Sequence, residues 1–446
     1  MISLVIVFLG CLLPLLAYSD NVIVPGATWT DTSGNAIQAH GGGILKVGDT
    51  FYWFGEDKAT NSGLFQAVSC YTSPDLLNWT RQVNALVPID GTMISTSNIV
   101  ERPKGKLDVT NSEYVMWFHS DSSDYGAAMV GVATSQTPCG PYTYQSSWRP
   151  FGAESRDMSL FQDDARTSYL LYASDVNQNF KMAQLDTNYY NVTAVVSELF
   201  GATLEAPGII KRNSVYYLFA SHTSGWAPNP NKWFSAQSMV GPWSSQSDIA
   251  PPAVNTYFSQ NAYDLPLGSG GIYMGDRWRP DLLGSSTYMW FPLDWSSGSP
   301  KIVEADVWNV DIDAGTYSVA QGVGYEAEQG LLSGAAVLFS NPAWSGGGAV
   351  GWLGNGGSVT INNVQGNGLG QWITISYANC DSSWRSTTVS VNSGPTVPVD
   401  QPNTGGCLVT LTVPVKLDLV AGPNSITVGS NQTTYAGDLD KIMVYG

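Results

Sequence analysis

The sequence predicts an all-β protein, a five-bladed β-propeller followed by a β-sandwich of the jelly-roll type. The 446 residues include 16 Trp, 22 Tyr and 47 Gly, a composition typical of short strands joined by tight turns. Stretches rich in Lys and Glu with helical periodicity are almost absent, which argues against a helical protein. A turn followed by a short aromatic strand also recurs five times before residue 320.

The recurring aromatic strand defines the repeated unit of the first domain. An apolar strand precedes each copy, and a further strand with a Ser/Gly/Pro turn follows it, so the unit has three or four antiparallel strands. Five such sheets arranged radially form a five-bladed propeller, in which repetition limits exposed sheet edges. A long β-sandwich is the alternative. The copies lie at residues 51–54, 114–118, 169–172, 216–219 and 288–291.

Changes in pattern divide the chain into three segments. Residues 1–19 form an apolar run that ends in Ala17-Tyr18-Ser19, as a cleaved signal peptide does, with a membrane anchor as the alternative. Residues 20–320 contain the repeats and are expected to form the propeller. Residues 324–446 alternate short strands with Gly-rich loops and are expected to form the β-sandwich.

Cysteines and glycosylation sequons indicate a secreted, extracellular protein. The chain has five cysteines, and cleavage after residue 19 would leave an even number, which suits an oxidising compartment. Cys380 and Cys407 lie in one segment and are expected to form a disulfide, while Cys70 and Cys139 could form a second. N-glycosylation sequons begin at Asn78, Asn191 and Asn431.

Charge and composition limit the partners of the protein. The chain carries 19 Lys and Arg against 36 Asp and Glu, a formal net charge of −17, so its surface repels nucleic acid and anionic membranes. Only three His occur and there is no C-x-x-C spacing, which argues against a zinc site. We expect neither a nucleic-acid nor a membrane partner, and we expect a monomer.

Acidic residues recur at the start of the first strand in four of the five units. In a propeller blade the first strand starts, and the second strand ends, at the same face, so these positions converge on a central funnel. A ring of carboxylates there can bind a metal ion or perform acid–base chemistry. Glu101 could instead pair with Arg102, and Asp276 beside Arg277 is expected to be structural. The five starts contain His40-Gly41-Gly42-Gly43, Glu101, Asp157, Glu205 and Asp276.

Glu205 and Asp157 best fit acid–base chemistry on a sugar. Such chemistry requires one protonated carboxyl group and another group that activates water. The apolar neighbours of Glu205 are expected to raise the pKa of its carboxyl group. Asp157 would raise that pKa further by charge repulsion and could orient the acid. The alternatives are a surface glutamate at a strand end for Glu205, and an ion pair with Arg156 or a turn cap for Asp157.

Loops after the second strands supply the rest of this face. Exposed Trp and Tyr rings can stack on the C–H faces of pyranose rings, while Glu, Asn and Thr can bond their hydroxyl groups. Individually such residues more often pack within loops, so it is their shared face that indicates a sugar-binding site. The candidates are Glu56, Tyr125, Asn179, Thr223 and Trp226.

Four segments in order resemble glycoside hydrolase family 43, a family of inverting five-bladed propellers, and within it the fungal and bacterial exo-β-1,3-galactanases. They are AHGGGILKVGDTFYWFGE, ERPK, SRDMSLFQDDARTSYLLY and LEAPGIIKRNSVYYLF. The resemblance spans about residues 21–320. It implies that Glu205 is the general acid and Asp157 its orienting, pKa-modulating partner. It also implies an exo-glycosidase that releases galactose from the non-reducing end of β-1,3-galactan, the main chain of arabinogalactan, without a catalytic cofactor.

The chain departs from the family at the general base. The family has an Asp at the start of the first blade, where this chain has His40-Gly41-Gly42-Gly43 and no carboxylate. Candidates for activating water are Glu101, Glu56 and Gln260, although an amide can only position water by hydrogen bonds. Inversion needs carboxyl groups about 6.5–9.5 Å apart to leave room for this water. We hypothesise that Glu101 or Gln260 holds it.

The C-terminal segment resembles carbohydrate-binding module family 35 through Tyr325-Glu326-Ala327-Glu328 and Gly437-Asp438-Leu439-Asp440. The first and last strands of a jelly roll lie close together, which would make Glu326, Glu328 and Asp440 ligands of a structural Ca²⁺. Solvated acids at a strand edge are the alternative. Such a module would hold the enzyme on its polymer. Candidate sugar contacts are Asn379, Tyr435 and Asp438.

Two other functions compete with galactan cleavage. Another exo-glycosidase of the same family, a β-xylosidase or α-L-arabinofuranosidase, would differ in the shape of its sugar subsites. A lectin-like propeller that has lost catalysis would explain the missing base. The presence of both Glu205 and Asp157 argues against a lectin, because a pure binding protein needs neither an acid nor its modulator.

Overall fold

The computed structural model describes residues 21–446, and they form an all-β protein, as predicted. The predicted signal peptide, residues 1–19, lies outside the described residues. The described residues contain 33 strands, one short helix, α1 (Asn255–Phe258), and five 3₁₀ turns. No helix among them is long and apolar enough to cross a membrane. The 3₁₀ turns are η1 (Pro150–Gly152), η2 (Pro252–Val254), η3 (Leu283–Ser285), η4 (Ala327–Gln329) and η5 (Ser345–Gly347).

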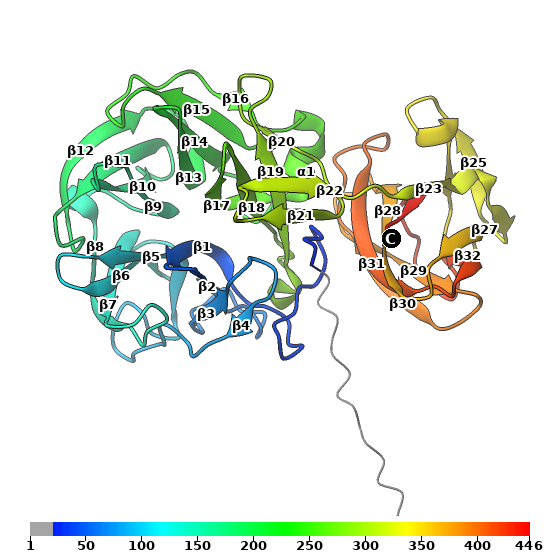
Figure 1. The fold of residues 1–446 in the computed structure, drawn as a ribbon, viewed down its shortest axis with the longest axis horizontal. Helices are drawn as coiled ribbons and strands as arrows, with labels where there is room; N and C mark the ends of the chain where they lie inside the picture. The colour runs from blue at the N-terminus through cyan, green and yellow to red at the C-terminus, as the bar shows by residue number, and fades with distance from the viewer. Residues whose placement is uncertain (1–20) are drawn as a thin grey trace, which may run out of the picture.

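The first 20 strands form five four-stranded antiparallel sheets in which neighbours along the chain are neighbours in the sheet (Figure 1). The first sheet contains β1 (His40–Val47), β2 (Thr50–Glu56), β3 (Val68–Ser73) and β4 (Thr80–Arg81). The second contains β5 (Asn98–Asp108), β6 (Glu113–Ser122), β7 (Met129–Ser135) and β8 (Thr143–Trp148). The third contains β9 (Met158–Gln162), β10 (Ser168–Ser174), β11 (Asn179–Leu185) and β12 (Val192–Leu199). The fourth contains β13 (Leu204–Arg212), β14 (Val215–His222), β15 (Lys232–Ala236) and β16 (Ser247–Asp248). The fifth contains β17 (Gln260–Leu267), β18 (Gly270–Arg277), β19 (Thr287–Asp294) and β20 (Lys301–Ile302).

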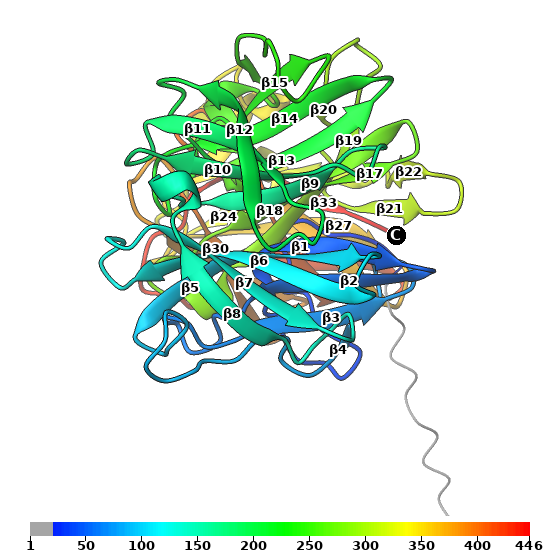
Figure 2. The same cartoon turned by 90° about the vertical axis from the view of Figure 1, so that its left-hand side faces the viewer.

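The first strands of the five sheets surround a common centre. β1 contacts β5, and the contacts continue through β9, β13 and β17 back to β1, with the later strands of each sheet farther out (Figures 1 and 2). The aromatic repeats lie in the second strand of the first four sheets, β2, β6, β10 and β14, and in the third strand of the fifth sheet, β19.

The fifth unit therefore does not begin beside Asp276, although its sequence pattern predicts a start there. Its first strand starts at Gln260, and Asp276 lies near the end of the second strand, β18. Because β18 is itself short, apolar and bounded by glycines, its sequence resembles the first strand of a unit. The two residues still reach the same face, because Gln260 pairs with Asp276 in the strand register.

Aromatic side chains fill the space between the first and fifth sheets. Trp53, Trp290 and Trp308 are buried there, and Trp29 packs edge-on against Trp290 at 4.9 Å between ring centroids. Ile23 exchanges two backbone hydrogen bonds with Trp308, of 2.7 and 3.0 Å. The start of the described chain is thus attached to the hairpin of β21 (Trp308–Asp311) and β22 (Thr316–Val319) beside the fifth sheet. Burial of a large apolar side chain stabilises the folded state by about 1.5–3 kcal/mol relative to leaving it exposed.

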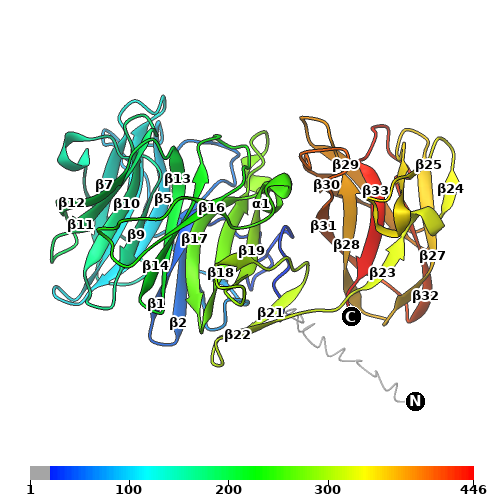
Figure 3. The ribbon, with the colours of Figure 1, turned by 90° about the horizontal axis from the view of Figure 1, so that it is seen from above.

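The remaining strands form two facing sheets at the C-terminal end, with buried aliphatic side chains between them (Figure 3). One contains β25 (Val337–Ser340), β26 (Gly348–Gly351), β33 (Asp438–Val444), β28 (Gly370–Ala378) and β31 (Leu411–Asp418), with β23 (Val323–Glu326) also paired to β33. The other contains β24 (Leu331–Ser333), β27 (Ser358–Gly366), β32 (Gly422–Val428), β29 (Arg385–Val391) and β30 (Thr396–Gln401).

Polar contacts hold the two sets of sheets together. The carboxylate of Asp306 accepts hydrogen bonds from Thr374 (2.8 Å), Thr412 (2.7 Å) and Tyr445 (2.8 Å). Arg279 forms an ion pair with Asp400 across the same junction. The C-terminal sheets therefore have a defined position beside the fifth sheet.

Two disulfides crosslink segments that are distant in the sequence. Cys380 and Cys407 are bonded, as the sequence predicts, with their Cα atoms 4.6 Å apart. Cys70 of β3 is bonded to Cys139, which follows β7, with 5.6 Å between Cα atoms. The second bond crosslinks the first and second sheets.

Candidate active site

β-Bulges recur beside the residues that face the centre of the ring. The pairing register shifts just after His40 in β1, Glu101 in β5, Glu205 in β13 and Asn261 in β17. In the first three bulges the next residue has a positive φ, of 58° at Gly41, 56° at Arg102 and 52° at Ala206. A bulge turns side chains away from the regular pleat, so the first strands aim polar groups at a common cavity.

Glu205 is a buried acid with a raised pKa. Burial, followed by the negative charge of Asp157, raises the pKa of Glu205 to about 8, although the charge of Arg102 lowers it. The amide Nε2 of Gln260 donates a hydrogen bond of 2.6 Å to Glu205 Oε1. At neutral pH this carboxyl group is therefore protonated and can act as a proton donor.

Asp157 is held next to Glu205 by two donors. Its Oδ2 accepts a hydrogen bond from the backbone N–H of Ala206 (3.1 Å) and forms an ion pair with the Nη2 of Arg102 (3.0 Å). The sequence offered Arg156 as the partner of Asp157, and this is wrong because Arg156 reaches Glu154 instead, at 3.4 Å.

The guanidinium of Arg102 lies at the centre of the cluster. Besides Asp157, its Nη2 donates to Gln260 Oε1 (2.6 Å), and its Nη1 donates to the carbonyl of Asn261 (2.8 Å). The backbone N–H of Arg102 donates to Glu56 Oε1 (3.0 Å). The alternative of a Glu101–Arg102 salt bridge is also wrong, because the bulge turns Arg102 toward Asp157 and Gln260.

Glu101 belongs to a separate chain of charges. His119 places its Nδ1 3.2 Å from Glu101 Oε2 and its Nε2 2.8 Å from Asp121 Oδ2. The hydroxyl of Tyr125 donates to Glu101 Oε1 at 2.8 Å. Burial would raise the pKa of Glu101, but the hydrogen bond and charge of His119 outweigh it and lower this pKa to about 2. Burial would lower the pKa of His119, but its two carboxylate partners raise it to about 9. Glu101 is thus an anion and His119 a cation at neutral pH.

Gln260 has a fixed orientation and one free N–H. Its Oε1 accepts hydrogen bonds from Arg102 and from the indole of Trp278 (2.9 Å), which uses both oxygen lone pairs. Its Nε2 donates one hydrogen to Glu205. The second amide hydrogen can therefore bind a ligand or a water molecule, whereas the oxygen cannot accept a proton.

A carboxylate from the fifth sheet occupies the space beside the glycine-rich start of β1. Asp276 accepts hydrogen bonds from the Gly41 N–H (2.9 Å) and lies 3.0 Å from His40 Nδ1. Both of its oxygens are engaged, as expected for a structural residue. Glu56 pairs with Lys58 at 2.9 Å, and burial raises the pKa of Glu56 despite that cation.

These groups border a cavity of about 370 Å³. Of the predicted residues, it brings together the four catalytic candidates and the binding candidates Glu56, Tyr125, Thr223 and Trp226. The lining residues are Glu56, Glu101, Arg102, His119, Tyr125, Arg156, Asp157, Asn177, Glu205, Thr223, Ser224, Gly225, Trp226, Gln260 and Trp278.

Asn179 is a correction, because it does not line this cavity. Its side chain donates to Asp175 Oδ2 (2.8 Å) and accepts from the Gly201 N–H (2.9 Å), so it stabilises the turn before β11. Asn177 lines the cavity instead, with a φ of 58°. Its buried Oδ1 makes no hydrogen bond to another described residue and is available to a sugar hydroxyl.

His119 is a site residue that the sequence patterns did not predict. In the strand register, Glu56 pairs with His40, His119 with Glu101 and Asp276 with Gln260. The end of each second strand therefore faces the functional residue of the first strand. Aligning the repeats at that position would have identified His119.

The three acids proposed as calcium ligands gather around one short turn in the C-terminal sheets. Ser345 donates from its hydroxyl to Glu326 Oε1 and from its backbone N–H to Asp440 Oδ1, each at 2.8 Å. The Oε2 atoms of Glu326 and Glu328 are buried and bond no other described residue. Buried, unpaired carboxylate oxygens suit a hard cation.

A separate cluster of possible ligand atoms lies in the catalytic cavity. Among residues 21–446, only Glu101, His119 and Asp157 bring three ligand atoms within 4.8 Å of one another. Both ring nitrogens of His119 already face carboxylates, those of Glu101 and Asp121, and Asp157 pairs with Arg102, so these groups are engaged in ion pairs rather than arranged as a metal centre.

Asn379 is a second correction, because it is only 1% exposed. Its Nδ2 donates to the carbonyls of Ser383 (3.0 Å) and Gln401 (3.1 Å), which leaves nothing for a sugar. Tyr435 is 38% exposed and lies edge-on to Trp352, which is 52% exposed. Asp438 is half-buried in β33.

The sequon asparagines differ in accessibility. Asn191 and Asn431 are exposed. Asn78 is half-buried, and its Nδ2, the atom that would carry a glycan, donates to Asp75 Oδ2 at 2.7 Å. The two exposed sites are thus the more accessible to glycosylation.

The chain is similar to a known protein family and to solved structures. Residues 39–264 match the family described as Glycosyl hydrolases family 43. The exo-β-1,3-galactanase of Phanerochaete chrysosporium is 68% identical, with a TM-score of 0.94 over 95% of this chain and 100% of that one. Its crystal structures hold galactose or, with a glutamate replaced by alanine or glutamine, β-1,3-galactotriose. An exo-β-1,3-galactanase of Clostridium thermocellum is 26% identical, with a TM-score of 0.64 over 89% and 100%. No curated protein matches the chain.

The first bulge predicts an unequal effect of alanine at two glycines with the same φ. Gly41 and Gly48 both have φ +58°. A Cβ added at Gly41 would lie 2.3 Å from Glu56 Oε1, whereas a Cβ added at Gly48 would have no atom within 4 Å. Glu56 is held by Lys58 and by the Arg102 N–H and cannot retreat. Gly48→Ala should lower the free energy of unfolding by about 1–2 kcal/mol, because alanine is strained at this φ. Gly41→Ala should lose the same amount and about 1–3 kcal/mol more, because its Cβ overpacks the site. Urea unfolding of both variants measures this, and equal losses would contradict the crowding.

Proposed function

The chain belongs to glycosyl hydrolases family 43, and we propose that it is an inverting exo-β-1,3-galactanase. It removes galactose from the non-reducing end of β-1,3-galactan. The observation that carries this proposal is the buried, protonated Glu205 beside the Asp157–Arg102 ion pair in a cavity of about 370 Å³. The 68% identical relative that holds β-1,3-galactotriose supports the choice of substrate. Release of galactose from β-1,3-galactotriose, with no cleavage of aryl β-xylosides or α-L-arabinofuranosides, is the test.

We also propose an assignment for each segment of the chain. The five sheets of residues 20–320 are the blades of a propeller, and residues 324–446 are a carbohydrate-binding module of family 35. Residues 1–19 are a signal peptide, and the mature chain is a secreted monomer. The two disulfides support an oxidising destination.

Glu205 acts as the general acid. Its proton passes to the glycosidic oxygen as the bond to the departing chain breaks, and this avoids expulsion of an alkoxide. Asp157 keeps that proton in place, because a second negative charge beside it is unfavourable. Arg102 holds the carboxylate of Asp157 beside Glu205 through their ion pair of 3.0 Å.

Glu101 and Gln260 are the residues that can hold the attacking water. Gln260 offers its free N–H next to the acid. Glu101 is ionised, and its oxygens retain lone pairs after bonding His119 and Tyr125. With a pKa near 2, Glu101 is a weak base, so the site acts chiefly by positioning water rather than by removing its proton in advance.

The C-terminal module keeps the enzyme on its polymer. Tyr435 and its neighbour Trp352 form an exposed aromatic platform, 5.3 Å apart edge-on, and Asp438 lies on the adjacent strand. A platform of this kind binds sugar rings, and attachment raises the effective concentration of chain ends. Glu326, Glu328 and Asp440 would hold a structural Ca²⁺ in this module.

The pKa of Glu205 predicts the alkaline limb of activity. A general acid works only while protonated, so kcat/KM on β-1,3-galactotriose should fall as pH rises through about 8. Asp157→Asn removes the repulsion and should move this limb to lower pH, whereas Asp313→Asn, on the exposed surface, should not. Glu205→Gln should lower kcat by about 10²–10⁴-fold. An unmoved limb in Asp157→Asn would contradict the modulating role.

Isosteres without hydrogen bonds test the water-holding residues. Gln260→Met and Glu101→Met should each lower kcat by about 10²-fold or more, with binding of β-1,3-galactotriose retained in calorimetry. Gln145→Met, on exposed strand β8, is the matched control, and thermal melting checks the fold of each variant. Full activity in both variants would refute the assignment.

Removal of calcium should destabilise the module. EDTA is expected to lower the melting temperature in calorimetry, because three carboxylates would lose their shared cation. Glu328→Gln should melt lower and no longer respond to EDTA, while the exposed Asp418→Asn should behave as wild type. An unchanged melting temperature of the wild type in EDTA would count against the site.

A further inference from the structure

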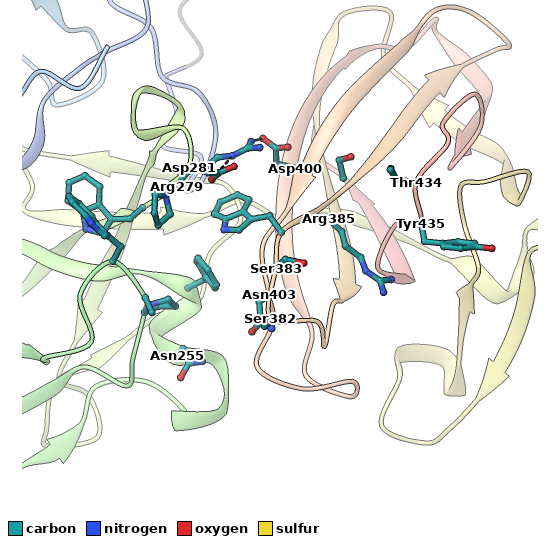
Figure 4. A pocket seen from close by; sticks show the side chains of 18 residues that line it. Asn255, Arg279, Asp281, Ser382, Ser383, Arg385, Asp400, Asn403, Thr434 and Tyr435 are labelled. Carbon is teal, nitrogen blue, oxygen red and sulfur yellow. Dashed lines mark hydrogen bonds and ion pairs between the residues drawn. The ribbon is translucent and has the colours of Figure 1, made fainter. Parts of the chain in front are cut away.

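A second and larger cavity, of about 900 Å³, lies between the fifth sheet and the C-terminal sheets (Figure 4). One wall contains Trp226, Phe258 and Trp278, and the opposite wall contains Ser382 and Trp384. Trp226 and Trp278 line both this cleft and the catalytic cavity. The two spaces are therefore neighbours separated by one pair of indole rings.

That pair of rings is tied to the reacting centre. Trp278 donates its indole N–H to Gln260 Oε1 at 2.9 Å, and its ring lies 4.8 Å from that of Trp226. The cleft wall is therefore joined through Trp278 to the amide that contacts Glu205. A ligand extending out of the catalytic cavity on this side enters the cleft.

The module contributes an aromatic ring to the opposite wall. Trp384, in the loop between β28 and β29, packs edge-on against Phe258 at 5.6 Å and carries the guanidinium of Arg279 over its face at 5.2 Å. Ser382, Ser383 and Asn403 provide hydroxyl and amide groups in the same wall. Aromatic rings with nearby polar groups are the chemistry that binds pyranose sugars.

The walls have fixed positions. The ion pair of Arg279 with Asp400 joins the two bodies at the cleft (Figure 4), and Asp306 bonds three residues of the module elsewhere in the junction. A cleft whose walls are already in place loses little entropy when a ligand binds.

We infer that the interdomain cleft binds the departing side of the substrate, the β-1,3-linked galactosyl units on the reducing-end side of the scissile bond. This inference rests on the proposed exo cleavage, in which the terminal sugar occupies the catalytic cavity and the rest of the main chain must leave through its open side. The module then has a role beyond attachment to the polymer, because Trp384 forms part of the path of the chain being cut.

Chain-length dependence of the rate tests this inference. We would measure kcat/KM on β-1,3-galactobiose, galactotriose and galactohexaose for wild type, Trp384→Ala and Ser382→Trp. Ser382 is exposed in the cleft, so a bulky ring there obstructs the path without disturbing the core. Phe200→Ala, at a residue that is 78% exposed in the turn between β12 and β13, is the matched control.

In wild type, kcat/KM should rise with length. Trp384→Ala and Ser382→Trp should each lower it about tenfold on the hexaose, leave the biose unchanged, and so flatten the length dependence. Phe200→Ala should leave the rates on all three oligosaccharides unchanged. Trp384 packs on Phe258, so thermal melting checks whether Trp384→Ala remains folded. If Trp384→Ala unfolds, Ser382→Trp still tests the inference.

Distinct results would overturn the inference. Equal losses on biose and hexaose, or unchanged rates in both cleft variants, would show that the main chain leaves by another route. Losses confined to substrates with β-1,6 side chains would assign the cleft to branches instead. If wild type released no galactose even from the biose, the proposed function itself would fail.

Discussion

The buried guanidinium of Arg102 is the interaction on which the rest of the site depends. It belongs to the second sheet, yet it bonds Asp157 beside the third sheet and Gln260 in the fifth, while its backbone N–H bonds Glu56 in the first. A buried charge requires partners, because loss of one leaves the others unpaired at a cost of several kcal/mol, roughly 3–5. Arg102 thus fixes the positions of Asp157, Gln260 and Glu56 relative to one another. The positive φ of Arg102 at its bulge lets its side chain reach these partners.

The chemistry follows from how charge is divided around that guanidinium. Asp157 stays beside Arg102 and leaves Glu205 as the group with a raised pKa. Glu101 is paired with His119 and kept ionised. Two carboxyl groups in one small cavity therefore hold opposite protonation states at neutral pH, as glycoside hydrolysis requires. The start of the first sheet has no carboxylate of its own. The carboxylate of Asp276, from the fifth sheet, bonds His40 and Gly41 there instead.

Local sequence was sufficient where a residue's own neighbours determine its environment. Glu205 stood out by its apolar flanks, and the five aromatic repeats located the sheets. Prediction failed where the deciding contact comes from another strand: the partner of Arg102, the role of His119 and the true start of the fifth unit at Gln260 are set by strands distant in the sequence. Asn179 and Asn379 were misjudged for a related reason, because polar residues in loops bond their own turns as readily as ligands, and sequence does not distinguish the two.

Time-resolved proton NMR of the protein acting on β-1,3-galactan tests the central claim most directly, because it reports the bond cleaved and its stereochemistry together. If a water held by Gln260 and Glu101 attacks opposite Glu205, galactose appears first as the α anomer and reaches the β anomer only by mutarotation. Galactose appearing first as the β anomer would show a covalent, retaining route and contradict the account. Line broadening without any product would instead indicate a binding protein.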